Sequence, residues 1–274
     1  MEDQETGCGR ALIKVLAVLI GLCVVVGIWG AVGKLDGLLP RALPTFPTAA
    51  PFTPWPTPAV AATFDFPLLP AGSYGPYVQG VTGPLAVDTR YGTQNPAQGD
   101  RANCFRDGDG GAVPFSRLYH AGVDLFARDG SGGIAWGEAT HAPVHAVATG
   151  VVVFVLDAGQ EGQVVGIEHR LADGSAVYSV YWHVSHVPVQ AGQPVTLGQM
   201  IAVVHDMGLN SHLHWEMRTF RDGSDLFPAG TAGARGTCNR QVAGVGYTWD
   251  DDPTRAHPDY YGYLDPSLFV EGRR

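Results

Sequence analysis

The chain has 274 residues, of which 45% are hydrophobic and only 16% are charged, and its formal net charge is −9. This acidic balance argues against a nucleic-acid-binding protein, which needs a basic surface, and the hydrophobic content is too high for a wholly disordered chain. Glycine (37) and proline (20) together make up about a fifth of the residues, above the average of roughly 12%, which favours a turn-rich β protein over a helical bundle.

Residues 15–33 form a run without a charged side chain. A helix of this length would span about 28 Å, close to the hydrocarbon thickness of a bilayer. A cleaved signal peptide is the alternative, but its apolar stretch usually has about 7–15 residues, and this run lacks an A-x-A cleavage site. We therefore predict a transmembrane anchor over residues 15–34, preceded by a short tail of residues 1–14.

Proline recurs every few residues between residues 39 and 70. Proline lacks the backbone N–H and has a fixed φ, so such a segment can form neither a helix nor a central strand. Its composition is typical of a semi-rigid polyproline spacer. We predict a Pro-rich linker over residues 35–71, which would hold a domain of residues 72–274 away from the membrane.

From about residue 72 the chain contains short runs rich in β-branched residues, separated by turn pairs such as Asp173-Gly174. This pattern predicts a mainly β domain, an antiparallel β-sandwich or open barrel. The runs are residues 143–156, 163–170, 176–184, 194–204 and 211–218. Residues 219–262 lack such runs and are rich in Gly, Asp, Arg and Thr. We interpret them as an insertion that follows a core of about residues 115–218.

Two cysteines, Cys104 and Cys238, fall in the predicted soluble domain. If this domain lies outside the cytoplasm, these two thiols can form one disulfide, which we predict. Two free thiols in a reducing compartment are the alternative. A four-cysteine zinc site is excluded, because the chain has no C-x2-C pair.

The stretch His212-Leu213-His214 points to chemistry. In a strand, residues i and i+2 point to the same face, so the two imidazoles would face one small site with Leu213 buried behind them. One imidazole can bind a metal while the other serves a bound water. An exposed polar strand face is the alternative explanation.

His120 and Asp124 form a second candidate pair. On a straight strand their Cα atoms would lie about 13 Å apart, too far for two ligands of one ion. A bend at Gly122, or a helical turn, would bring them together. Two histidines and a carboxylate are a common ligand set of catalytic zinc, which keeps an open fourth position.

Five motifs follow one another between about residues 115 and 218. They are His120-Ala121-Gly122-Val123-Asp124, Pro143-Val144-His145-Ala146 with Gly150-Val151-Val152, Tyr181-Trp182-His183-Val184-Ser185, Val195-Thr196-Leu197-Gly198-Gln199-Met200-Ile201, and His212-Leu213-His214-Trp215-Glu216. In this order they resemble the motifs of the lysostaphin/LytM-type zinc metallopeptidases. Each motif alone is a weak signal, but five in the same order are specific. The resemblance implies an antiparallel β domain of the duplicated hybrid motif type.

The resemblance also assigns roles to residues. It implies that His120, Asp124 and His214 are the ligands of a zinc ion (Zn²⁺). It further implies that His183 and His212 are catalytic residues that flank the metal-activated water and the polarised carbonyl. The sequence departs from the family in having His141-Ala142 where Gly-Thr is common, and in its long insertion.

The family resemblance implies a zinc-dependent endopeptidase, a hydrolase that cleaves peptide bonds in the stems or cross-bridges of peptidoglycan. Its expected partners are peptidoglycan peptides and, through the N-terminal helix, the cell membrane, with no nucleic acid. The expected location is a single-pass membrane protein with its C-terminal domain outside the cytoplasm. The alternative is a non-catalytic cell-envelope module that binds peptidoglycan or regulates a partner hydrolase.

Overall fold

The computed structural model describes residues 57–77, 89–94, 105, 107–221 and 246–274. The chain divides into two units, residues 1–54 and residues 55–274, and the described residues all belong to the second. The predicted tail, the predicted anchor of residues 15–34 and both cysteines of the predicted disulfide, Cys104 and Cys238, lie outside the described residues. Within the described ranges, no helix has the length and apolar character that crossing a membrane requires.

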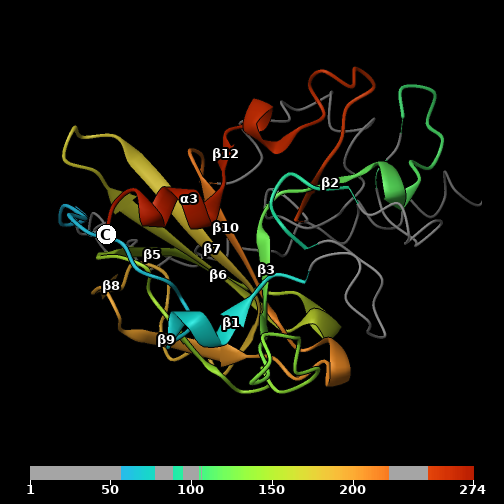
Figure 1. The fold of residues 1–274 in the computed structure, drawn as a ribbon. Coiled ribbons are helices and arrows are strands. Elements are labelled where there is room, and N and C mark those ends of the chain that lie inside the picture. Colours follow the sequence, from blue (N-terminus) through green and yellow to red (C-terminus); the bar gives the residue numbers. More distant parts are fainter. Residues whose placement is uncertain (1–56, 78–88, 95–104, 106, 222–245) are drawn as a thin grey trace, which may run out of the picture. The chain divides into compact units, whose positions relative to one another are not determined.

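The second unit is built on one large antiparallel sheet (Figure 1). Its strands run in the order β1 (Tyr74–Gly75), β3 (Val123–Ala127), β10 (Leu213–Arg218), β7 (Ala176–Ser185), β6 (Gln163–Arg170), β5 (Gly150–Asp157) and β8 (Pro194–Val195). In addition, β12 (Tyr263–Leu264) pairs with β10, and β9 (Met200–Val204) pairs with both β7 and β4 (Pro143–His145). The prediction of a mainly β, antiparallel domain is confirmed.

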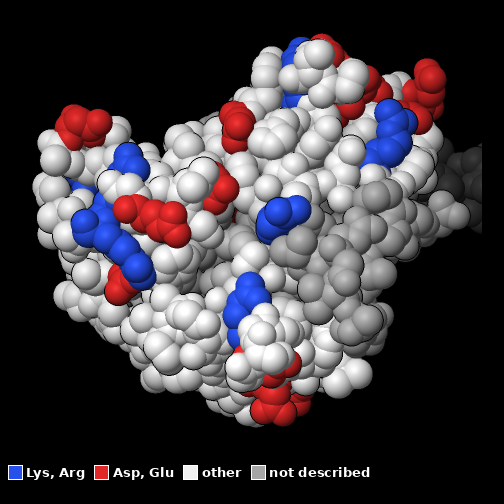
Figure 2. Space-filling model, viewed as in Figure 1, with Lys and Arg blue, Asp and Glu red and all other residues white. Residues whose placement is uncertain are grey.

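Short helices and a second, smaller sheet complete the described part of the unit. The smaller sheet pairs β2 (Tyr119–His120) with β11 (Tyr247–Thr248). The one-turn helices are η1 (Ala71–Ser73), η3 (Phe115–Arg117), η4 (Gly159–Glu161), η5 (Gly208–Asn210) and η6 (Pro258–Tyr261), and the α-helix is α3 (Pro266–Glu271). On the face shown in Figure 2, acidic and basic side chains are interspersed and separated by wide uncharged areas.

The main core follows from the alternation of apolar side chains along the central strands. On β10, Leu213, Trp215 and Met217 are fully buried in this core. The even-numbered residues His214 and Glu216 point to the opposite face, because successive side chains of a strand alternate. One strand therefore supplies both a wall of the core and a row of polar side chains.

The structure corrects the predicted linker of residues 35–71. Its described part, residues 57–71, is here named the N-terminal strap, and it packs on the domain. Phe64 and Leu68 are 2% and 1% exposed, and the amides of Ala61 and Asp65 donate to carbonyls of the domain. The domain thus begins before residue 72. Proline removes only its own N–H, so the residues between the prolines remain able to pair and to bury their side chains.

The burial of Phe64 gives a test of this correction. We expect Phe64→Ala to lower the free energy of unfolding by about 3–5 kcal/mol, because the ring is buried against Phe269 and the core. Leu69→Ala is the control, since Leu69 in the same strap is 44% exposed. Denaturant unfolding of the full chain measures both. Equal, small effects of the two substitutions would contradict a packed strap.

His169, a buried histidine that is not one of the predicted site residues, makes the stability of the protein depend on pH. His169 is fully buried, its Nδ1–H donates to the Thr149 carbonyl at 3.0 Å, and its Nε2 lies 2.7 Å from the Ser179 hydroxyl. Burial lowers the pKa of His169 to about 4 from the ordinary 6.5. The folded protein therefore keeps this ring neutral at pH values where the unfolded chain already protonates it.

We expect this residue to make the protein less stable in mild acid. The folded pKa is the lower one, so the contribution is present above pH 6.5 and is lost as the pH falls towards 4. The full loss is about 3 kcal/mol. The measurement is the free energy of unfolding against pH for the wild type and His169→Gln. The difference in free energy of unfolding between the wild type and the variant should shrink as the pH falls from 6.5 towards 4. A constant difference would show that His169 is not the source of the pH dependence.

Candidate metal centre

A bend between two strands brings His120 and Asp124 together. Strand β2 ends at His120, β3 begins at Val123, and the chain bends at Gly122 between them. As a result, Nε2 of His120 lies 3.1 Å from Oδ1 of Asp124. Of the two arrangements that the spacing allowed, the structure has the bend rather than the helical turn.

Gly122 is required here for space. A Cβ at this position would lie 2.6 Å from the Trp215 carbonyl oxygen and 2.8 Å from Nε2 of His214. Strand β10 therefore passes too close for any side chain. Gly122 does not have a positive φ, so its conformational freedom is not the reason for the glycine.

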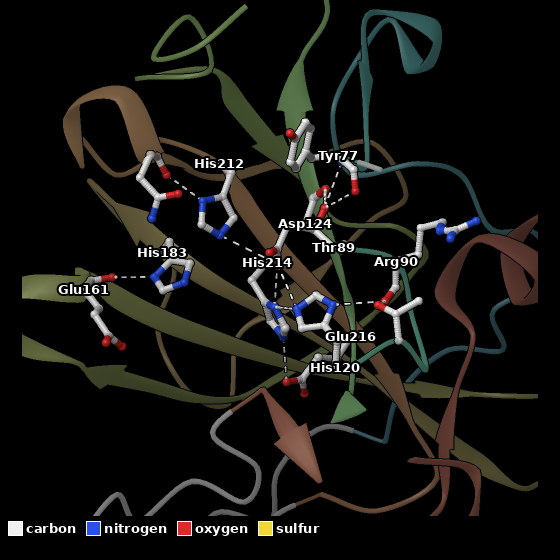
Figure 3. A network of polar contacts seen from close by, with 12 residues as sticks. Tyr77, Thr89, Arg90, His120, Asp124, Glu161, His183, His212, His214 and Glu216 are labelled. Carbon is white, nitrogen blue, oxygen red and sulfur yellow. Dashed lines mark hydrogen bonds and ion pairs between the residues drawn. The ribbon is translucent and has the colours of Figure 1, made fainter. Parts of the chain in front are cut away.

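Strand β10 adds the third side chain to this pair. His214 pairs with Asp124 across β3 and β10, and its Nδ1 lies 2.8 Å from Asp124 Oδ1 and 3.0 Å from His120 Nε2. Figure 3 shows these three groups pointing toward one another, with His183 and His212 to one side. All three side chains are buried, and their ligand atoms form the group able to hold a metal ion that is found among the described residues.

These three groups fit a zinc ion. Tetrahedral zinc with bonds of about 2.0–2.1 Å separates its ligand atoms by roughly 3.3 Å. The separations of 2.8, 3.0 and 3.1 Å are close to this value. Two imidazole nitrogens and one carboxylate oxygen are also a donor set that zinc prefers and that leaves a fourth position open.

His212 and His183 lie beside the three predicted ligands. Nε2 of His212 lies 3.6 Å from Asp124 Oδ1, and the ring of His183 lies 4.9 Å from that of His212. His183 has a φ of 58°, which is rare for a residue other than glycine. Both Trp182 and His183 lie near His214, at ring distances of 6.5 and 6.4 Å. A regular strand would direct only one of two neighbours to this face, so the left-handed backbone turns His183 back to the site.

Backbone carbonyls fix the tautomers of three histidines. The Nδ1 atoms of His120, His183 and His212 each face a carbonyl oxygen. The acceptors are the carbonyls of Arg90, Glu161 and Asn210, at 3.3, 3.2 and 2.6 Å. A carbonyl can only accept, so Nδ1 carries the proton in each ring. Each Nε2 is therefore left with a lone pair that can bind a metal or accept a proton.

His214 has the opposite tautomer, which is fixed by residues to which the sequence analysis gave no role. Its Nε2 lies 3.0 Å from Oε1 of Glu216, whose Oε2 accepts from Nε of Arg218 at 2.6 Å. The side chains of Glu216 and Arg218 are both fully buried. A carboxylate on the far nitrogen of a ligating histidine orients the ring and raises its basicity. The signal was present in the sequence, since residues 212, 214, 216 and 218 alternate on one strand face.

Burial and neighbouring charged groups shift the pKa values of the site residues in opposite directions. Burial lowers the pKa of His183 well below its ordinary value and also lowers the pKa of His212, so both rings are neutral at pH 7. Burial alone would raise the pKa of Asp124, but His120 and His212 hold it well below the usual range. Burial opposes protonation of His214, yet its bonds to Asp124 and Glu216 raise its pKa to about 9.

Comparison with protein families agrees with the resemblance seen in the motifs. Residues 119–228 match the sequence profile of peptidase family M23. This match over residues 119–228 confirms the resemblance to lysostaphin/LytM-type enzymes. The match contains all five predicted site residues. A search of curated proteins finds no significant match.

Similar solved structures cover part of the chain. A zinc-containing peptidase from Vibrio cholerae is 24% identical, with a TM-score of 0.33, over 57% of this chain and 37% of that one. A putative M23 peptidase from Pseudomonas aeruginosa is 17% identical, with a TM-score of 0.32, over 59% and 48%. The lysostaphin catalytic domain from Staphylococcus simulans is 18% identical, with a TM-score of 0.31, over 63% and 89%. The chain thus spans less than half of the first two.

The geometry predicts which side chains a zinc ion needs. Loss of an outer partner of a metal ligand costs about 10–100-fold in affinity, so His120→Ala or Asp124→Ala should cost more than about 100-fold. Competition with a chromophoric chelator measures this on the full chain. His145→Ala is the matched control, because its ring instead contacts the Pro67 carbonyl, 3.3 Å from Nδ1. Wild-type affinity in Asp124→Ala would show that zinc binds elsewhere.

Proposed function

We propose that the chain is a zinc-dependent endopeptidase that cleaves peptide bonds in the stems or cross-bridges of peptidoglycan. The observation that carries this proposal is the convergence of His120 Nε2, Asp124 Oδ1 and His214 Nδ1 within 4.8 Å of one another, beside the buried His212 and the half-buried His183. The match of residues 119–228 to peptidase family M23 supports both the hydrolase class and the peptidoglycan substrate.

In this proposal the chain's own groups divide the work. When bound, zinc supplies Lewis acidity, which polarises a carbonyl group and acidifies a water molecule. His212 and His183 present Nε2 lone pairs, because their Nδ1 protons are held by backbone carbonyls. A neutral imidazole in this position can take the proton of the attacking water and later give it to the leaving amine. Once Nε2 of such a ring is protonated, its N–H group can stabilise the oxyanion.

We further propose that the domain acts outside the cytoplasm and is anchored to the cell membrane. The support is the uncharged run of residues 15–33, which is long enough to cross a bilayer, and the location of peptidoglycan itself. The remaining residues before the domain would then act as a tether. In this arrangement the N-terminal strap marks the start of the folded domain.

The catalytic assignment predicts that binding and turnover separate. His183→Ala and His212→Ala should keep zinc but lower the rate of hydrolysis by about 10²–10⁴-fold, the usual contribution of a positioned acid–base group. The measurement is digestion of purified peptidoglycan by the full chain, with the released fragments identified by mass. His145→Ala and a chelator-treated sample complete the series.

Each outcome of this experiment separates the candidate functions. Release of peptides that stops on chelation and drops in both histidine variants supports the proposal and identifies the bond that is cut. Full activity in His183→Ala or His212→Ala would overturn the assigned roles. Zinc binding and wall binding without any release would replace the enzyme with the non-catalytic envelope module.

A further inference from the structure

The strand that carries His120 depends on segments outside the family-matched region. Strand β2 has only two residues, Tyr119 and His120. On one edge, the amide of His120 donates to the Thr93 carbonyl at 2.9 Å, and the amide of Gly92 donates to the His120 carbonyl at 2.8 Å. On the other edge β2 pairs with β11. Both of these neighbours lie outside residues 119–228.

Strand β11 places an aromatic ring directly on the predicted ligand. Tyr247 is the register partner of His120, and the two ring centroids are 5.3 Å apart. The same tyrosine ring lies 4.8 Å from Phe115, at the edge of a small second core. That core consists of Phe105, Val113, Phe115, Leu118 and Trp249. The imidazole of His120 is therefore held against a side chain that is itself anchored.

The residue before Tyr247 closes on the other predicted histidine ligand. The Gly246 carbonyl accepts from the Ala121 amide at 2.9 Å, which fixes its position beside β2. Gly246 has a φ of +77°, and a Cβ at this position would lie 3.0 Å from Cε1 and 3.1 Å from Nε2 of His214. The backbone at residue 246 thus limits how far the His214 ring can move.

We propose that Gly246 and Tyr247 are positioning residues of the metal centre. They return from the insertion to hold the imidazoles of His120 and His214, so metal affinity depends on how this return segment packs. The inference rests on the proposed ligand set but not on the proposed hydrolysis. A two-residue strand has few hydrogen bonds of its own, and without these contacts zinc binding would have to order the ligand, which costs free energy.

The first test compares variants at Tyr247. Tyr247→Ala should weaken zinc binding by about 10–100-fold, as outer-shell losses do, while Tyr247→Phe, which keeps the ring, should stay near the wild type. Val113→Ala is the matched control, because Val113 is 2% exposed in the same small core and is not part of β11. Zinc affinity is measured by chelator competition on the full chain, and the visible spectrum of the cobalt-loaded protein reports the ligand geometry.

The second test uses two glycines with the same backbone conformation. Gly246→Ala and Gly110→Ala both place alanine at a positive φ, +77° and +83°, but a Cβ at Gly110 meets nothing within 4 Å. Both variants share the backbone strain of alanine at a positive φ. Only Gly246→Ala should weaken zinc binding and change the cobalt spectrum, because only its methyl group presses on His214.

The outcomes decide the proposal separately from the proposed function. Wild-type zinc affinity in both Tyr247→Ala and Gly246→Ala would overturn it, and so would an equal loss in Val113→Ala and Tyr247→Ala. If Tyr247→Ala does not fold, the glycine pair decides alone. A wild-type chain that binds zinc but releases no peptide would refute the hydrolase and leave this inference standing.

Discussion

Burying an ionisable side chain is costly unless another group pairs with it, and the face of β10 opposite the main core is built under this constraint. Arg218 pairs with Glu216, Glu216 with His214, and His214 with Asp124 on the neighbouring strand. Each member pairs with the next, and the row ends where Nε2 of His120 meets Nδ1 of His214 and Oδ1 of Asp124. The candidate metal centre lies at the end of this row of buried polar pairs.

This row of polar pairs depends on the close approach of β10 to the residues before β3. Residue 122 has no side chain because the Trp215 carbonyl and the His214 ring occupy the space. The chain bends at this residue, and β3 then sets Asp124 opposite His214. The packing of the apolar face therefore also determines the geometry of the polar face, because Leu213 and Trp215 anchor β10 to the main core.

Local patterns predicted the parts of the site that lie on regular strands. Alternation placed His212 and His214 on one face, and a simple distance argument required either a bend or a helical turn between His120 and Asp124. The left-handed backbone of His183 has no local sequence signal, because a residue other than glycine adopts it only when the surrounding fold imposes it. Contacts such as Tyr247 on His120 join residues far apart in the chain, and no periodicity encodes them.

The prolines of the strap were misleading for a related reason. Composition describes what a segment does alone, and a proline-rich segment alone is a spacer. Phe64 and Leu68 lie between the prolines, and the fold offers them a surface that the sequence does not announce. The surface on which the strap packs therefore determines its structure, as pairing with β2 does for β11.

The strap also determines where mechanical force enters the domain. A pull on the chain before residue 57 first reaches the amides of Ala61 and Asp65 and the carbonyl of Pro67. These hydrogen-bond partners lie on β6, after β4 and on β4, and the ring of Phe66 in the strap also packs against Trp215 of β10. Tension on the strap would therefore load its hydrogen bonds to β6 and β4, and it would reach β10 through the contact between Phe66 and Trp215. The strap thus couples a pull on the preceding chain to the strand that carries His214.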